Sequence, residues 1–166
     1  MPELSQKERL QLSLLDRLSD DEPDQLSESR DKRIISVSRL KQLVQRDLAW
    51  LLNTAASSTN MDFDEYPEVQ KSVLNYGILD LSGVNAIALN AKNIERELVK
   101  SIRHYEPRII PRSLKITVQL AKEEMTSHTL SFEISGDLWA QPLPLQLFLK
   151  TDVDIENGNI TMSDWR

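Results

Sequence analysis

The spacing of apolar residues changes along the chain, and this change predicts where helices give way to strands. In residues 38–53 and 84–104 apolar positions recur every three or four residues, as on one face of an amphipathic helix. Ser38 can cap the first stretch, and cations in the last turn of the second complement the helix dipole. The positions expected to face the core are Leu40, Leu43, Val44, Leu48, Leu51 and Leu52, then Ile87, Ala91, Ile94, Leu98 and Ile102.

Between these two stretches the sequence predicts a third, short helix. It begins at Pro67, because proline suits the first helical position. Val69, Val73 and Leu74 are expected to point inward, and Gly77 provides a left-handed stop.

Beyond Pro107 the apolar period becomes two, which predicts strands. Asn157-Gly158 is a hairpin signal, and Pro142 and Pro144 push residues 140–144 towards a sheet edge or a bulge. Helices followed by about four strands predict an α+β fold with a small, mostly antiparallel sheet. The alternating apolar positions are Leu114, Ile116, Val118, Leu120, Leu130, Phe132, Ile134, Leu143, Leu145, Leu147, Leu149, Val153, Ile155, Ile160 and Met162.

The N-terminal part divides into a helix and a linker. Residues 6–18 follow a capping box and carry a stripe that includes Leu14, Leu15 and Leu18. Residues 19–33 are too polar to form a core, so we expect residues 1–18 as an amphipathic helix, 19–33 as a linker and 34–166 as one α+β domain. The leucine stripe either folds back as a flap or docks in a partner's groove, and the polar linker favours the partner.

Composition narrows the class of protein. The 166 residues suit one domain, and the absence of cysteine excludes disulfide frameworks and zinc–thiolate sites. The net charge of −6 argues against nonspecific nucleic-acid binding, which needs a basic face. No apolar stretch is long enough to span a membrane, and the acidic N-terminus lacks the order of a signal peptide. We therefore expect a cytoplasmic protein.

A search for chemistry finds no metal, nucleotide or nucleophile motif. His104 and His128 are isolated, and Asp62-Phe63-Asp64-Glu65 lacks the glycine and terminal glutamate of a calcium loop. The glycines do not form a phosphate cradle. We expect no cofactor and no catalytic residue, which leaves interaction as the leading class of function.

The most unusual cluster of charge lies where the last predicted helix ends. Glu106 stands next to the negative end of the helix dipole, and Pro107 pushes it out of helical geometry. Arg103, Arg108 and Arg112 lie nearby. One interpretation is a Glu–Arg clasp that fixes the corner between helix and strand; the other is that Glu106 or Arg108 faces a partner. Asp47, in the first long helix, is interpreted as a solvated or arginine-paired group.

The order of several short motifs resembles a known family. These are Ser13-Leu14-Leu15-Asp16-Arg17-Leu18, Arg46-Asp47-Leu48, Leu51-Leu52-Asn53-Thr54, Tyr66-Pro67-Glu68-Val69, residues 72–83, Tyr105-Glu106-Pro107-Arg108 and residues 149–158. Together they resemble the TssE family of type VI secretion baseplate subunits. This family belongs to the wider group of contractile phage tail baseplate wedge proteins, often labelled lysozyme-like.

The resemblance implies a structural role rather than catalysis. It implies a place in the baseplate wedge beside TssF and TssG, and a sheet like the sheath subunit's strand-exchanging handshake domain, on which the TssB–TssC sheath is seeded. Glu106, Pro107 and Arg108 match the family's Glu-Pro-Arg motif, which is implicated in holding the wedge together. In the C-terminal strands, Leu147 and Leu149 would give register to an added strand.

The alternative is a peptidoglycan-cleaving glycosidase, as the lysozyme label suggests. Such an enzyme needs two carboxylates across a sugar cleft, one of them protonated. The arginines around Glu106 would keep it ionised, and only 5% of the residues are aromatic, which leaves few for stacking on sugars.

Overall fold

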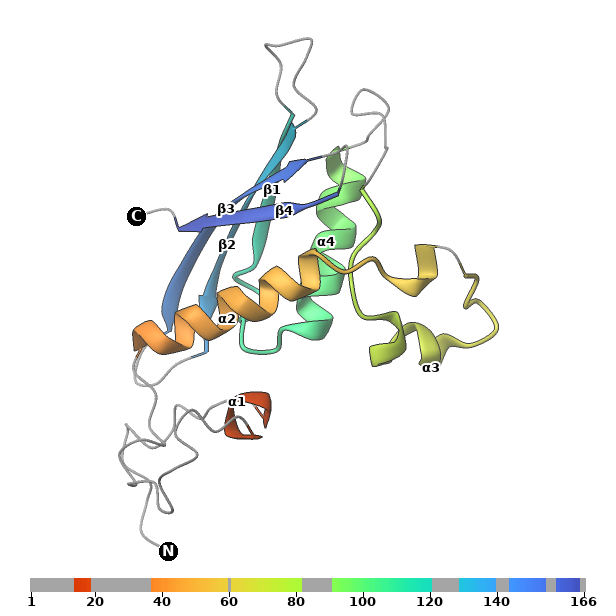
Figure 1. Cartoon of the computed structure of the whole chain (residues 1–166), viewed down its shortest axis with the longest axis horizontal. Helices are drawn as coiled ribbons and strands as arrows, with labels where there is room; N and C mark the ends of the chain where they lie inside the picture. Colours follow the sequence, from red (N-terminus) through yellow and green to blue (C-terminus); the bar gives the residue numbers. More distant parts are fainter. Residues whose placement is uncertain are drawn as a thin grey trace, which may run out of the picture.

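The computed structural model describes residues 14–18, 37–59, 61–81, 91–120, 129–139, 144–154 and 158–164. Helices come first along the chain and strands last, which confirms the predicted α+β fold (Figure 1). The helices are α1 (Leu14–Leu18), α2 (Val37–Leu52), α3 (Pro67–Gln70) and α4 (Ala91–Tyr105), with short 3-10 turns η3 (Ser57–Thr59) and η4 (Val73–Asn75). The strands are β1 (Lys115–Leu120), β2 (Thr129–Leu138), β3 (Leu145–Asp154) and β4 (Ile160–Asp164).

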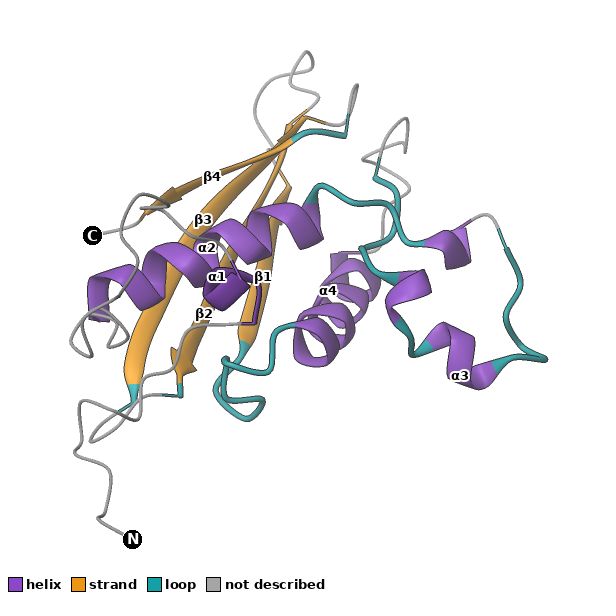
Figure 2. Cartoon of the chain, turned by 60° about the horizontal axis from the view of Figure 1, so that its bottom comes forward, coloured by secondary structure: helices purple, strands orange, loops and turns teal. Residues whose placement is uncertain are grey.

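The strands form one antiparallel sheet in the order β1-β2-β3-β4. Residues that pair across neighbouring strands are buried together, such as Ile116 with Ile134 and Val153 with Ile160. Among the described residues, the alternating apolar positions predicted from the sequence therefore lie on the inner face of the sheet. The helices α2 and α4 lie on that face (Figure 2). Thr151 is fully buried there, and its hydroxyl donates to the Phe132 carbonyl at 2.6 Å.

The two long helices carry the predicted core faces. In α2 the six expected positions are at most 4% exposed, and in α4 Ile94, Leu98 and Ile102 are at most 3% exposed. Residues 84–90, the linker 19–33 and residues 6–13 of the first predicted helix lie outside the described residues, as do Leu143 and Asn157. Among the described residues, no helix is long and apolar enough to cross a membrane.

The prediction for the short helix was wrong in two respects. It ends at Gln70, well before Gly77, and Val73 and Leu74 are 80% and 68% exposed instead of buried. Hydrogen bonds to the backbone hold this segment: the Tyr105 hydroxyl donates to the Ser72 carbonyl at 2.9 Å. The apolar side chains are not needed to attach it and point outward.

Gly77 allows this segment to return to the helical layer. Its φ is +133°, and the backbone of the next residue pairs with residues 54–56, with the Ile78 N–H donating to the Thr54 carbonyl at 2.8 Å. A Cβ atom at Gly77 would stand 2.4 Å from that carbonyl oxygen. The position therefore needs glycine for both its conformation and its space.

We expect Gly77→Ala to lower the free energy of unfolding by about 3 kcal/mol, because positive φ and a backbone clash add together. Chemical denaturation measures this. Gly136→Ala is the comparison, since the nearest atom to its Cβ would belong to the Ile109 side chain, at 3.1 Å, and the next, Leu114 Cα, would be 3.6 Å away. Equal losses in the two variants would contradict the assigned role of Gly77.

Candidate functional site

Glu106 is buried at the corner where α4 ends and the chain turns towards the sheet. Its N–H donates to the Ile102 carbonyl at 2.8 Å, and its own carbonyl accepts from the Ile109 N–H at 3.2 Å, which closes a tight turn over Pro107. The residue is only 3% exposed. A carboxylate so removed from water needs a cation and hydrogen bonds to be tolerated.

Arg108 supplies both the cation and the hydrogen bonds that the buried Glu106 carboxylate needs. Its Nε donates to Glu106 Oε1 at 2.7 Å and its Nη2 to Oε2 at 2.5 Å, a bidentate pair that uses both carboxylate oxygens. The Arg108 backbone N–H also donates to Oε1, at 3.1 Å. Both oxygens of Glu106 thus accept hydrogen bonds from Arg108, an arrangement unlike that of a glycosidase acid, which must face its substrate.

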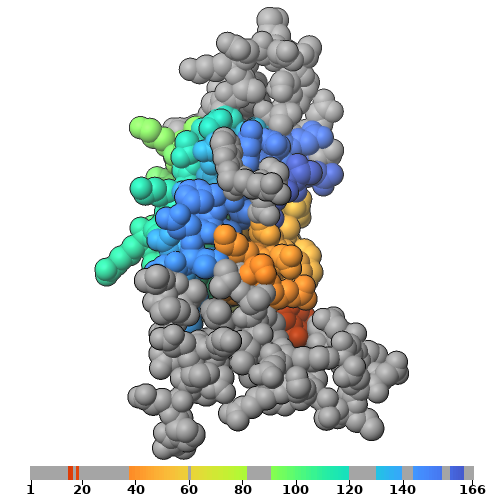
Figure 3. Space-filling view, turned by 90° about the vertical axis from the view of Figure 1, so that its left-hand side faces the viewer, coloured from red at the N-terminus to blue at the C-terminus, as the bar shows by residue number. Residues whose placement is uncertain are grey.

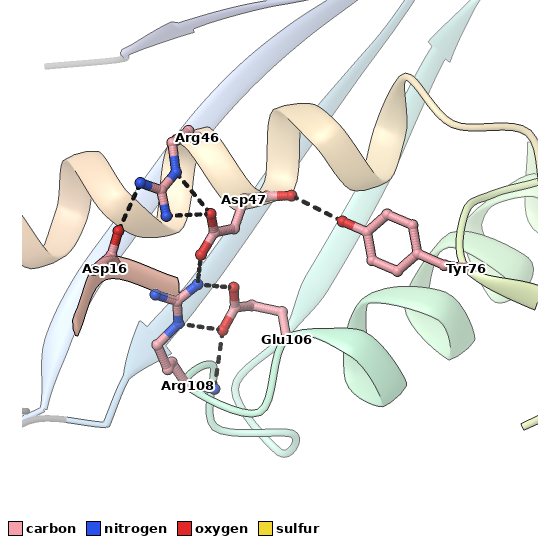
Figure 4. A network of polar contacts seen from close by, with 6 residues as sticks. All are labelled: Asp16, Arg46, Asp47, Tyr76, Glu106 and Arg108. Carbon is pink, nitrogen blue, oxygen red and sulfur yellow. Dashed lines mark hydrogen bonds and ion pairs between the residues drawn. The ribbon is translucent and has the colours of Figure 1, made fainter. Parts of the chain in front are cut away.

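The same guanidinium reaches the other long helix. Arg108 Nη2 donates to Asp47 Oδ2 at 2.5 Å, so one side chain joins the end of α4 to the middle of α2 (Figure 4). The side chains of Arg108 and Asp47 are each 22% exposed. We refer to Asp47, Glu106 and Arg108 as the clasp.

A second arginine extends this network towards the N-terminus. Arg46 Nε donates to Asp47 Oδ1 at 2.9 Å, and Arg46 Nη1 donates to Asp16 of α1 at 2.6 Å. The Arg46 guanidinium also lies 4.8 Å from the ring centre of Trp50. Negative and positive side chains therefore alternate along the network from Asp16 to Glu106. The ion pair between Asp16 and Arg46 places α1 next to α2 (Figure 3).

The surroundings favour the charged forms of both arginines. Burial opposes the charge on Arg108, but hydrogen bonds and attraction to Glu106 and Asp47 outweigh it and raise the pKa of Arg108 above its ordinary value. The hydrogen bond to Asp16 is the main cause that raises the pKa of Arg46. The network therefore favours both guanidinium groups as cations.

The structure brings together residues that the sequence offered separately. The sequence left two interpretations open for Glu106 and Arg108, an internal clasp and a contact with a partner. The contacts that the two residues make are those of the clasp, and Asp47 is paired with an arginine. The connection between Asp47 and Arg108 spans 61 positions and was not predicted. In the sequence, the only signal for this network was a glutamate placed just after the C-terminus of a helix.

The remaining predicted partner residues lie elsewhere. Leu15 and Leu18 of α1 are 48% and 76% exposed, and the side chain of Leu14 lies outside the described part. Leu147 and Leu149 are each 2% exposed, because they face the helices from an inner strand. Within the described residues, no group of three or more His, Asp and Glu side chains is placed to hold a metal ion.

The part of the chain that contains the clasp also matches a known protein family. Residues 38–143 match the family described as baseplate wedge protein gp25. The chain belongs to this family, as its motifs indicated, and its role is that of a structural baseplate component that contacts other baseplate proteins. The matched region contains the whole clasp. No curated protein and no solved structure gives a significant match.

We expect Arg108→Ala to lower the free energy of unfolding by about 3 kcal/mol, since it leaves the Glu106 carboxylate buried without its cation. Urea denaturation followed by circular dichroism measures the loss. Arg112→Ala is the matched control, because Arg112 is exposed and its loss should cost no more than about 0.5 kcal/mol. If the two variants were equally stable, the clasp would not hold the fold.

Stability should also fall at alkaline pH through Tyr76, whose hydroxyl donates to the Asp47 carbonyl at 3.4 Å. Burial, followed by the charges of Asp47 and Glu106, raises the pKa of Tyr76. Above about pH 10 the unfolded chain loses this proton while the folded chain keeps it, so stability decreases as pH rises. Tyr76→Phe should flatten this slope between about pH 9 and pH 11.

Thermal melts at intervals across that range measure the slope. Tyr66→Phe is the control, because the Tyr66 side chain is 60% exposed. A slope unchanged by Tyr76→Phe would show that the Tyr76 hydroxyl does not contribute to alkaline unfolding.

Proposed function

We propose that the chain is a TssE-type wedge subunit of a type VI secretion baseplate, which acts in the cytoplasm, joins TssF and TssG and seeds the TssB–TssC sheath. The observation that carries this proposal is the family match over α2 to β2, together with the ordered motifs that resemble the type VI branch. The clasp supports a scaffold rather than a glycosidase, because both oxygens of Glu106 are held by Arg108.

The Glu-Pro-Arg motif contributes to assembly by fixing a corner. Glu106 is buried and Arg108 binds inward to Asp47, whereas Pro107 between them is exposed. A surface formed by Pro107 and the turn around it keeps its shape as long as the ion pairs hold. Contact with TssF and TssG then depends on the clasp indirectly, through the shape of this turn.

The free sheet edge on the β4 side supports contact with the sheath through a strand. Every residue of β3 pairs with β2, but β4 pairs only with Leu149–Val153. The backbone of residues 145–148 thus has no strand beside it among the described residues. Unpaired N–H and C=O groups of this kind are what an added strand binds.

The opposite edge is less accessible. The Val118 N–H of β1 donates to the Glu95 carboxylate of α4 at 3.0 Å. Where β2 extends beyond β1, the Ile110 N–H donates to the Asp137 carbonyl at 2.8 Å and covers that edge. An added strand therefore fits better beside residues 145–148, where Leu147, and Leu149 at the boundary with the stretch paired to β4, would set its inward-facing positions.

The stripe on α1 is a second proposed contact. Leu15 and Leu18 are exposed while Asp16, with its side chain 8% exposed, binds Arg46. The ion pair would orient the helix so that its leucines face a partner's groove.

Two lysines placed on the open edge should separate the two proposed contacts. We expect Gln146→Lys/Phe148→Lys to keep binding to purified TssF–TssG and to lose nucleation of TssB–TssC sheaths, since lysine side chains block strand addition. Both positions are exposed, so the fold should tolerate the change. Co-purification and electron microscopy of sheaths give the two readouts.

Gln42→Lys/Thr117→Lys is the control, with the same added charge at exposed positions of α2 and β1. Normal sheath nucleation by the edge variant would exclude the strand contact. If the wild-type chain bound neither TssF–TssG nor TssB–TssC, the type VI assignment itself would fail.

A further inference from the structure

Part of the segment that connects α2 to α4 along the chain projects from the helical layer as an arm (Figure 1). We define the arm as residues 57–59 and 61–76, which contain η3, α3 and η4. It falls within the region that matches the family, and its Tyr76 hydroxyl donates to the Asp47 carbonyl of the clasp, but it lies apart from the open edge of the sheet and none of the proposed contacts uses it.

The arm displays four of its large apolar side chains to solvent. Val73 and Leu74 are 80% and 68% exposed, and Met61 and Tyr66 are 62% and 60% exposed. In α3 and η4, no described residue is buried. Single exposed apolar residues are ordinary on a protein surface, but four in one short segment favour contact with a partner.

Polar contacts, rather than burial of these side chains, hold the arm in place. The Ser57 hydroxyl donates to the Leu74 carbonyl at 2.8 Å, and the Ser58 N–H donates to Asn75 Oδ1 at 2.8 Å, so the two limbs of the arm are connected. From α4, His104 Nε2 lies 2.5 Å from the Lys71 carbonyl oxygen and the Ser101 hydroxyl donates to the Gly77 carbonyl at 2.6 Å. The backbone is therefore fixed before any partner arrives, which reduces the entropic cost of binding.

The charges of the arm indicate what it binds. Asp62, Asp64, Glu65 and Glu68 are exposed on it, and Lys71 is its one cation, which makes the arm's charge −3. The Lys71–Glu68 pair has N–O separation 3.9 Å, with side chains 65% and 90% exposed, so it neutralises little. An acidic surface with exposed apolar groups complements a basic segment that has apolar side chains.

We infer that the arm is a docking site for a lysine- and arginine-rich segment with an apolar face, supplied by another protein of the baseplate. That the partner belongs to the baseplate rests on the proposed function. The chemistry expected of the partner rests on the side chains of the arm alone. A second copy of the chain is a poor occupant, because its net charge is −6. Nucleic acid and anionic membranes are repelled by the same charges.

The first experiment tests the chemistry without any secretion protein. The isotope-labelled full chain is titrated with two helical peptides of equal length, each with a leucine stripe, one flanked by lysines and the other by glutamates. We expect the lysine peptide to shift the amide resonances of residues 61–76, with the effect decreasing as salt is added. The glutamate peptide should leave them unchanged.

Two variants test which features of the arm matter. Val73→Ser/Leu74→Ser removes apolar side chains and Glu65→Gln/Glu68→Gln removes charge; each should weaken lysine-peptide binding at least tenfold at an unchanged melting temperature. Gln42→Lys/Thr117→Lys, which makes the same change in net charge away from the arm, should change affinity less than threefold.

Several outcomes would overturn the inference. These are equal shifts with both peptides, no shift with either, or shifts confined to residues outside the arm. Concentration-dependent dimers in sedimentation that Val73→Ser/Leu74→Ser abolishes would assign the arm to a second copy instead.

Binding to purified TssF–TssG then tests the location of the partner. A tenfold loss of affinity in the arm variants supports the inference, and equal affinity overturns the arm's role in the baseplate while leaving the proposed function intact. If the wild type failed to bind TssF–TssG, the proposed function would fail, and the peptide titration would still decide the chemistry of the arm.

Discussion

A buried carboxylate at the end of α4 is the constraint around which the two halves of this molecule are arranged. Glu106 is almost fully removed from water, where an isolated charge would cost several kcal/mol, and the bidentate pair with Arg108 offsets that cost. Because Arg108 also binds Asp47, the pair fixes the position of α2 relative to the corner after α4. The corner after α4 and the middle of α2 are thus connected by one guanidinium as well as by apolar packing.

This arrangement suits a structural subunit, since a scaffold must present several surfaces in a fixed relation. The turn at Pro107, the open backbone of residues 145–148 and the arm at 57–76 are carried by different elements. The apolar core between α2, α4 and the sheet holds these elements together, and the clasp locks the corner between them. A change that loosens the clasp would therefore alter surfaces that its own side chains do not touch.

The core and the arm are stabilised in opposite ways. Apolar burial stabilises the core, where the two long helices and the inner face of the sheet exclude water. In the arm, hydrogen bonds from Ser57, Ser101 and Tyr105 hold the backbone, and the apolar side chains of η4 remain exposed. A folded chain that orders a segment without burying its apolar groups leaves them available for a partner.

The sequence by itself determined the two long helices, the strands and the face that each of these buries, because local periodicity and burial depend on residues close together in the chain. It predicted α2 within one residue at each end, and its unusual Glu106 indicated a paired charge. Only the tertiary structure decided that Asp47 completes the clasp, that Leu147 and Leu149 lie on an inner strand, and that Val73 and Leu74 face outward. These facts depend on contacts between residues far apart in sequence, and neither spacing nor composition records which distant side chain or strand will be the neighbour.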